Sequence, residues 1–206
     1  MRTLTKDMQN KISPEGAVTL LRDGNARFVN NLKLNRNLLQ QVNETSDGQH
    51  PFAVIISCMD SRTSAELIFD QGLGDVFSIR IAGNVINEDI LGSAEFGCKV
   101  VGAKVIVVMG HTGCGAIKGS IADVDLGHLH FITHKVQRCI PALKAKYPNA
   151  SENDMCSHVT RENILMGVAD LKSRSSILEE MNYKGEIKIV GALYDISTGV
   201  VEFLDA

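Results

Sequence analysis

The stretch FAVIISCMDSR, residues 52–62, begins as an apolar run and ends on three reactive side chains. The run FAVIIS is short, continuous and rich in branched residues, which is typical of a strand buried on both faces of a parallel sheet. Cys58, Asp60 and Arg62 follow at every second position. Because a strand sends alternate side chains to one face, these three side chains can project together from its end.

Strand patterns alternate with helix patterns along the rest of the chain. Further strands are expected at 75–83 and 104–110, and two more within 186–204, joined by a turn at DISTG. Helices are expected at 63–72, 88–102, 114–124, 128–147 and from about 154 to 181. This order predicts an α/β fold with a mostly parallel central sheet flanked by helices and an antiparallel edge strand at the C-terminus.

The residues before the first strand, 1–48, are expected to form an N-terminal helical arm. SPEGAVTLLRDGNARFV, residues 13–29, opens with Ser13 as a helix N-cap, and its apolar residues recur at helical spacing. The stretch 35–49 is polar and typical of a connecting segment. We expect residues 1–206 to form a single domain, with the arm packing on a partner subunit.

Composition excludes several classes of partner. The formal net charge of −3 argues against a nucleic-acid surface dominated by phosphate contacts. The longest apolar runs, such as VIVVM at 105–109, are far too short to cross a bilayer. The start MRTLTKDMQNK has no apolar core and does not resemble a secretory signal peptide. We expect a soluble cytoplasmic protein that binds neither nucleic acid nor membrane.

The chain has five cysteines, an odd number spread over about a hundred residues. This pattern does not resemble the disulfide framework of a small secreted protein. Cys98 and Cys139 fall inside predicted helices, and Cys156 has no companion motif, so these three are expected to be structural. Cys58 and Cys114 remain as candidates for metal binding or catalysis.

The third predicted strand ends on HTGCG, residues 111–115. His111 and Cys114 are three positions apart in a glycine-rich turn, a spacing that lets both side chains reach one ion. If this strand neighbours the first, Cys58 meets them at the same sheet edge, where open α/β sheets bind their ligands. Two thiolates and one imidazole form a three-ligand zinc set, and three protein ligands with an open fourth position are typical of catalytic zinc.

The carboxylate and guanidinium beside Cys58 suggest how the fourth position is controlled. Asp60 can accept a hydrogen bond from zinc-bound solvent, and Arg62 can fix that carboxylate by a bidentate pair. Without this restraint, Asp60 could itself occupy the fourth position. We therefore expect an Asp60–Arg62 dyad that gates zinc-bound hydroxide, with Asp60 moving to the metal at lower pH. Backbone N–H groups around Gly113 and Gly115 can help to hold the product.

CMDSR, followed some fifty residues later by HTGCG, resembles the C-x-D-x-R and H-x-x-C-G elements of the β-class carbonic anhydrases. The similarity runs from about Gln49 through Gly119. It implies Zn²⁺ bound by Cys58, His111 and Cys114, gated by the dyad already described. It also implies an α/β fold whose N-terminal helices embrace a partner subunit, giving a homodimer or homotetramer.

The same resemblance implies an activity and one more site residue. The reaction is the reversible hydration of carbon dioxide to bicarbonate and a proton. Gln49 stands nine residues before Cys58, where many family members have a glutamine that contributes an amide to the substrate pocket across the dimer interface. Some bacterial members use a tryptophan in a second bicarbonate pocket, and this chain has no tryptophan.

Three alternative functions remain open from the sequence alone. A hydrolase of carbon disulfide or carbonyl sulfide could use the same scaffold, since both are linear, apolar relatives of carbon dioxide. A phosphatase or sulfurtransferase could use Cys58 as nucleophile, although such enzymes place an arginine six positions after the cysteine, and Arg62 is only four after it. A non-catalytic zinc module would need a closed fourth position, for which no further ligand is evident.

Overall fold

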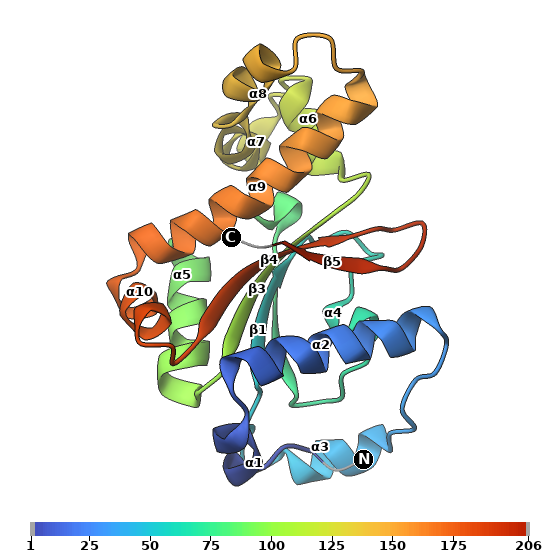
Figure 1. Cartoon of the computed structure of the whole chain (residues 1–206), viewed down its shortest axis with the longest axis vertical. Coiled ribbons are helices and arrows are strands. Elements are labelled where there is room, and N and C mark those ends of the chain that lie inside the picture. The colour runs from blue at the N-terminus through green and yellow to red at the C-terminus, as the bar shows by residue number, and fades with distance from the viewer. Residues whose placement is uncertain (1–2, 205–206) are drawn as a thin grey trace.

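The computed structural model describes residues 3–204 and contains a five-stranded sheet in the order β2-β1-β3-β4-β5 (Figure 1). The strands are β1 (Ala53–Ser57), β2 (Val76–Arg80), β3 (Val105–His111), β4 (Lys188–Tyr194) and β5 (Val201–Leu204). The first four are parallel, and β5 pairs with β4 in the antiparallel direction. The structure confirms the predicted mostly parallel sheet with an antiparallel C-terminal edge.

Ten α-helices lie within the described residues. They are α1 (Lys6–Lys11), α2 (Pro14–Val29), α3 (Leu38–Glu44), α4 (Ala65–Ile68), α5 (Glu88–Glu95), α6 (Gly115–Ile121), α7 (His130–Gln137), α8 (Ile140–Lys146), α9 (Glu152–Arg174) and α10 (Ser176–Tyr183). A short 3₁₀ turn, η1 (Ala82–Asn84), follows β2, and a π-helical stretch (Phe96–Val101) extends α5. None of these helices is long and apolar enough to cross a membrane.

Alternate residues of the central strands face two separate apolar cores. Val54 and Ile56 of β1 belong to the core beneath α5, α9 and α10, whereas Ala53 and Ile55 belong to the core beneath α2 and α4. Every residue of β1 and β3 is buried. This two-sided burial is the reason that both strands read as continuous apolar runs in the sequence.

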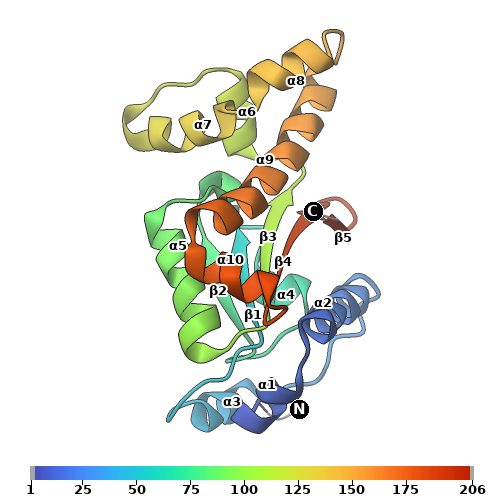
Figure 2. The ribbon, with the colours of Figure 1, turned by 60° about the vertical axis from the view of Figure 1, so that its left-hand side comes forward.

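A third core lies beyond the carboxyl ends of the strands. It joins α6, α7, α8 and the first half of α9, which together form a helical lobe at the top of the molecule (Figure 2). Cys58 and Cys114 belong to this third core. The edge of the sheet where the sequence places its chemistry is therefore covered by the helical lobe.

Three assignments made from the sequence are wrong in part. The segment 128–147 is divided into α7 and α8, with Pro141 near the start of α8. The segment expected to be one helix from about 154 to 181 is two helices, because the Ser175 side chain accepts a hydrogen bond from the Leu178 amide and caps α10. The polar stretch 35–49 contains α3, which begins where the Asn37 side chain accepts a hydrogen bond from the Gln40 amide. Local capping bonds decided the starts of α3 and α10.

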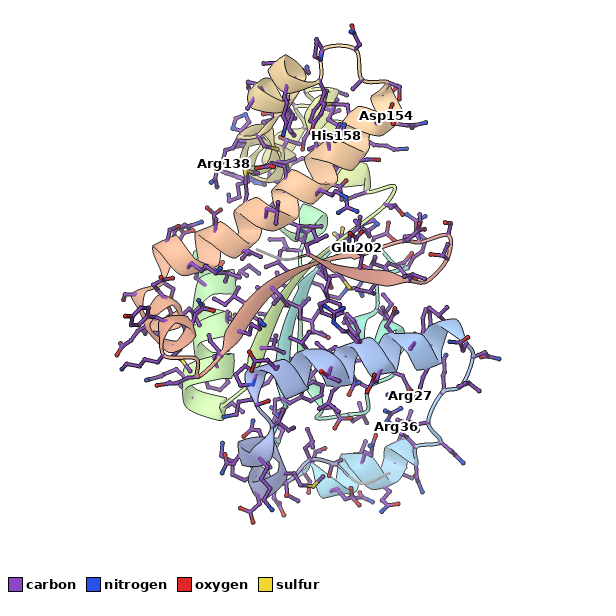
Figure 3. The ribbon with its side chains drawn as sticks, viewed as in Figure 1. Arg27, Arg36, Arg138, Asp154, His158 and Glu202 are labelled. Atoms are coloured by element: carbon purple, nitrogen blue, oxygen red, sulfur yellow. The ribbon has the colours of Figure 1, made fainter. Side chains whose placement is uncertain are left out.

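The N-terminal arm is attached to its own sheet through α2. Ala17 and Leu21 are fully buried in the core that contains Ile55. Arg27 and Arg36 converge on the carboxylate of Asp70, each at 2.6 Å (Figure 3). The arm is therefore an integral part of this subunit. Its packing on a partner subunit, and the single-domain boundaries 1–206, stay predictions.

One glycine permits this close approach of α2. A Cβ atom added at Gly24 would lie 1.8 Å from the backbone oxygen of Phe69, whereas one added at Gly92, on the exposed side of α5, meets nothing within 4 Å. Gly24→Ala should lower the free energy of unfolding by at least about 1 kcal/mol, because α2 must move outward. Gly92→Ala should raise it by about 0.5–1 kcal/mol through helix propensity.

Denaturant unfolding of both variants tests this packing. Because both substitutions add one methyl group to a helical glycine, Gly92→Ala is a matched control for Gly24→Ala. A Gly24→Ala protein that unfolds at the wild-type denaturant concentration would show that α2 does not rest on the Phe69 backbone.

Candidate metal centre

The parallel pairing of β1 with β3 brings the two sequence motifs together. In the register of these strands Ser57 lies opposite Met109, so the chain after β1 and the end of β3 meet at one edge. Cys58 directly follows β1, His111 is the last residue of β3, and Cys114 stands three residues later, immediately before α6. The three predicted ligands therefore come from adjacent strand ends.

The three side chains converge on one point. Their ligand atoms all lie within 4.8 Å of one another, and the Cys58 and Cys114 sulfurs are 3.9 Å apart. Two sulfurs bound to one tetrahedral zinc ion at the usual bond length are separated by about 3.8 Å. The spacing of the sulfurs thus fits a shared zinc ion without rearrangement. Each of the three residues is at most 4% exposed.

The imidazole of His111 is prepared to act as a ligand. Its Nδ1 donates to the backbone oxygen of Thr112 at 2.9 Å, which leaves the lone pair on Nε2. Nε2 is buried and has no hydrogen-bond partner among the described residues. A buried polar atom without a partner is rare in folded proteins. A cation between the two sulfurs and Nε2 would satisfy it.

The two thiols are electrostatically coupled. The Cys114 thiol faces the sulfur of Cys58 and lowers the pKa of Cys58, and neighbouring hydrogen-bond donors lower that pKa further. The resulting thiolate raises the pKa of Cys114 well above its usual range, and burial adds to that rise. A divalent cation between the two sulfurs would favour the thiolate form of both side chains.

Hydrogen bonds from neighbouring segments fix the backbone around Cys58. The Thr63 hydroxyl donates to the Cys58 oxygen at 2.8 Å, and Arg80 donates to the oxygens of both Cys58 and Asp60. The Gly83 amide donates to the Cys58 sulfur at 3.4 Å. Arg80 reaches this point because it is the last residue of β2 and pairs with Ser57. No role for these residues could be predicted from the sequence, since their contacts depend on strand order and register.

Asp60 and Arg62 form the expected bidentate pair. Nε and Nη2 of Arg62 donate to the two carboxylate oxygens of Asp60 at 2.9 and 2.7 Å, and the Arg62 backbone amide adds a third bond. These bonds hold the pKa of Asp60 well below its usual range. Asp60 is ionised and oriented, and it is not among the side chains whose ligand atoms cluster within 4.8 Å. In this arrangement the Asp60 carboxylate is not one of the candidate metal ligands.

The remaining predicted site residues occupy different places. Gly113 has φ +68° in the turn between His111 and Cys114, and Gly115 is the first residue of α6. Gln49 is exposed and precedes β1, at the strand end opposite to Cys58. Gln49 therefore lies away from the three candidate ligands of its own chain. A role for Gln49 in catalysis would require a second subunit.

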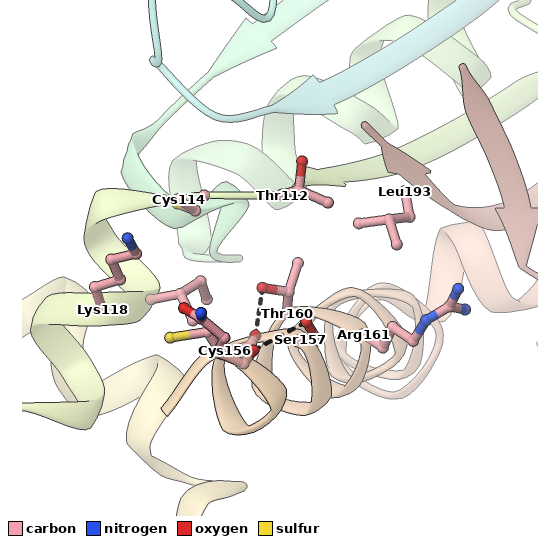
Figure 4. Close-up of a pocket in the computed structure, with 11 residues that line it drawn as sticks. Thr112, Cys114, Lys118, Cys156, Ser157, Thr160, Arg161 and Leu193 are labelled. Carbon is pink, nitrogen blue, oxygen red and sulfur yellow. Dashed lines mark hydrogen bonds between the residues drawn. The ribbon is translucent and has the colours of Figure 1, made fainter. Parts of the chain in front are cut away.

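A cavity of about 260 Å³ opens on the side of Cys114 that faces α9 (Figure 4). Thr112 and Cys114 form one wall, and Cys156 lies on the α9 wall with Ser157 and Thr160. Neither Asp60 nor Arg62 lines this cavity. Cys98 and Cys139, by contrast, are buried in apolar cores.

Known proteins resemble the chain over nearly its whole length. The carbonic anhydrase family model matches residues 53–201. Carbonic anhydrase of Mycolicibacterium smegmatis is 36% identical over 197 residues, covering 92% of this chain and 93% of that protein. Carbonic anhydrase 2 of Mycobacterium tuberculosis is 37% identical over 193 residues, covering 91% of each. The β-carbonic anhydrase of Coccomyxa, solved with acetazolamide, aligns with a TM-score of 0.72 at 26% identity, covering 79% of this chain and 75% of that one. The chain belongs to the β-carbonic anhydrase family.

Proposed function

We propose that this protein catalyses the zinc-dependent, reversible hydration of carbon dioxide to bicarbonate and a proton. The observation that carries this proposal is the convergence of two buried sulfurs and an unpartnered imidazole nitrogen. Membership of the β-carbonic anhydrase family supports the same reaction. Cys58, His111 and Cys114 would hold the zinc ion.

The donor set suits a catalytic rather than a structural metal. A bound zinc ion supplies a Lewis acid that lowers the pKa of water, so that hydroxide is available near neutral pH. The described residues offer three ligand atoms at this point, and catalytic zinc sites typically have three protein ligands. Two thiolates also balance the charge of Zn²⁺, so the buried centre is neutral as a whole.

The dyad would orient the nucleophile. An ionised carboxylate is a hydrogen-bond acceptor only, and Arg62 fixes the direction of both Asp60 oxygens. Asp60 would accept a hydrogen bond from the attacking water or hydroxide and so direct its lone pair toward the carbon of carbon dioxide. N–H groups of Gly113 and Gly115 would help to hold bicarbonate. A proton leaves to solvent in each cycle.

We further propose a homodimer or homotetramer in which Gln49 of one subunit serves the substrate pocket of another. The position of Gln49, exposed and distant from its own Cys58, supports an arrangement of this kind. Solved relatives from Sordaria macrospora are described as tetrameric. Cytoplasmic location is part of the same proposal, supported by five cysteines that are all free.

The alternative functions gain no support. The named relatives are carbonic anhydrases, and none is described as acting on carbon disulfide or carbonyl sulfide. A nucleophilic role for Cys58 is disfavoured because its sulfur faces a second thiol and Arg62 is occupied by Asp60. A non-catalytic zinc module would need a fourth ligand, and the described residues supply three.

The ligand set is tested by Cys58→Ser, with Cys156→Ser as the matched control. Loss of one sulfur should reduce bound zinc from one ion per chain to near zero and slow carbon dioxide hydration by more than about a hundredfold. Metal content by mass spectrometry and stopped-flow hydration give the two readouts. A Cys58→Ser protein that keeps its zinc or its activity contradicts the assignment, whereas Cys156→Ser should match the wild type.

The dyad is tested by Asp60→Asn, with the exposed Asp89→Asn as control. Asparagine keeps the shape but loses the charge that Arg62 pairs with. We expect zinc content to stay at one ion per chain while the hydration rate falls by about 10- to 100-fold. If Asp60→Asn hydrates carbon dioxide at the wild-type rate, Asp60 does not orient the nucleophile.

Zinc should also stabilise the fold, because its three ligands come from two strand ends that separate on unfolding. Removing the metal with a chelator should lower the free energy of unfolding by about 2.7 kcal/mol if free zinc stood at about 100 times its dissociation constant. Denaturant unfolding with and without chelator measures the change. Cys58→Ser should show no response to chelator, and an equal response in both proteins would place the stabilising metal elsewhere.

A further inference from the structure

A buried chain of two hydrogen bonds connects α9 to the sulfur of Cys58. Nδ2 of Asn163 donates to the backbone oxygen of Gly83 at 2.8 Å, and the amide of Gly83 donates to Cys58 Sγ at 3.4 Å. Asn163 is only 5% exposed. The three residues are far apart in the sequence, so only the fold brings them into line.

The turn at Gly83 and Asn84 needs such support because Asn84 has a conformation that is unfavourable for a residue with a side chain. Gly83 has φ +66°, and Asn84 directly after it has φ +45°. Two successive left-handed residues are uncommon, and glycine and asparagine are the residues that tolerate them best. A Cβ atom at Gly83 would lie 3.2 Å from the Cβ of Ala116. An unfavourable turn of this kind persists when surrounding contacts hold it in place.

Asn163 itself is held firmly by the packing of α9. The next residue, Ile164, is fully buried and lies over Gly110 of β3 and Gly191 of β4. A Cβ atom at either glycine would come within 2.8 Å of the Ile164 side chain. The helix therefore rests directly on the two strands, which fixes the position from which Asn163 reaches Gly83.

We propose that Asn163 is a positioning residue of the metal centre, which holds the Gly83 amide against the Cys58 sulfur and so tunes the thiolate that binds zinc. The inference rests on the proposed function, because it takes Cys58 as a zinc ligand. An N–H···S bond withdraws negative charge from the sulfur. In a centre with two thiolates this matters, because each thiolate reduces the Lewis acidity of the metal. Partners of this kind typically change metal affinity by about 10- to 100-fold.

A purely structural role for Asn163 makes a different prediction, and α2 provides the matched comparison. Asn25 is 6% exposed and donates to the backbone oxygens of Ile68 and Gly199. It lies on the opposite face of the sheet and contacts none of the metal ligands. The Asn25 amide also accepts a hydrogen bond from the Val201 amide, so its loss should destabilise the fold at least as much as loss of the Asn163 amide, but leave zinc binding unchanged.

The experiment compares Asn163→Leu with Asn25→Leu, since leucine keeps the branching of the asparagine side chain and removes the donor. Zinc affinity is measured by competition with a chromophoric chelator, and the electronic state of the sulfur by the thiolate-to-metal absorption band of the cobalt(II) protein. Asn163→Leu should bind zinc about 10- to 100-fold more weakly and move the band to lower energy. Asn25→Leu should stay within about twofold of wild type and keep the band.

Wild-type affinity together with an unshifted band in Asn163→Leu would overturn the inference. If that variant does not fold, the wild-type protein loaded with ¹¹³Cd and labelled with ¹⁵N-glycine gives the answer. A scalar coupling between the metal and the Gly83 amide proton supports the bond to Cys58, and its absence overturns it. Failure of the proposed function is separate, since it would appear as zinc retained by Cys58→Ser.

Discussion

The register between β1 and β3 is the constraint on which the rest of the structure depends. Ser57 lies opposite Met109, and this pairing sets Cys58 beside His111 and Cys114. A slip by one residue would send every side chain of a strand to the other face. Both strands are buried on both faces between apolar cores, so any such slip would disrupt the packing of two layers. The hydrophobic packing of the sheet therefore fixes the geometry of the metal centre.

The charges of the candidate ligands at this sheet edge also need to be balanced. Two thiolates and an imidazole lie in the third core, beside apolar side chains such as Val85 and Ile117. Uncompensated negative charge in this position would be costly, because the surroundings cannot solvate it. One divalent cation would cancel the charges of both thiolates, and Asp60 is paired separately with Arg62. With a divalent cation bound, the proposed centre would carry no net charge.

The sequence alone was sufficient to predict the candidate site residues that directly follow strands. Continuous apolar runs identified β1 and β3, and the reactive residues after each run identified the sheet edge. Arg80, Gly83 and Asn163 could not be found in this way, because each acts through contacts with residues distant in the chain. The break at Ser175 was missed for a related reason. Apolar spacing continues across it, and only the capping bonds show that the helix ends.

The hydrogen bonds around Cys58, His111 and Asp60 divide the candidate centre into a rigid part and a more exposed part. Cys58 is fixed by a buried hydrogen bond from Gly83, and His111 by a partly buried hydrogen bond to Thr112. Asp60 depends instead on Arg62, whose side chain is 51% exposed. Exposed ion pairs are weakened by water and salt, whereas buried hydrogen bonds are largely protected from both. Solution conditions therefore act on the orientation of the carboxylate far more than on the ligand set. In the proposed centre, the fold would keep the three ligands in place, and the exposed Asp60–Arg62 pair would control the fourth position.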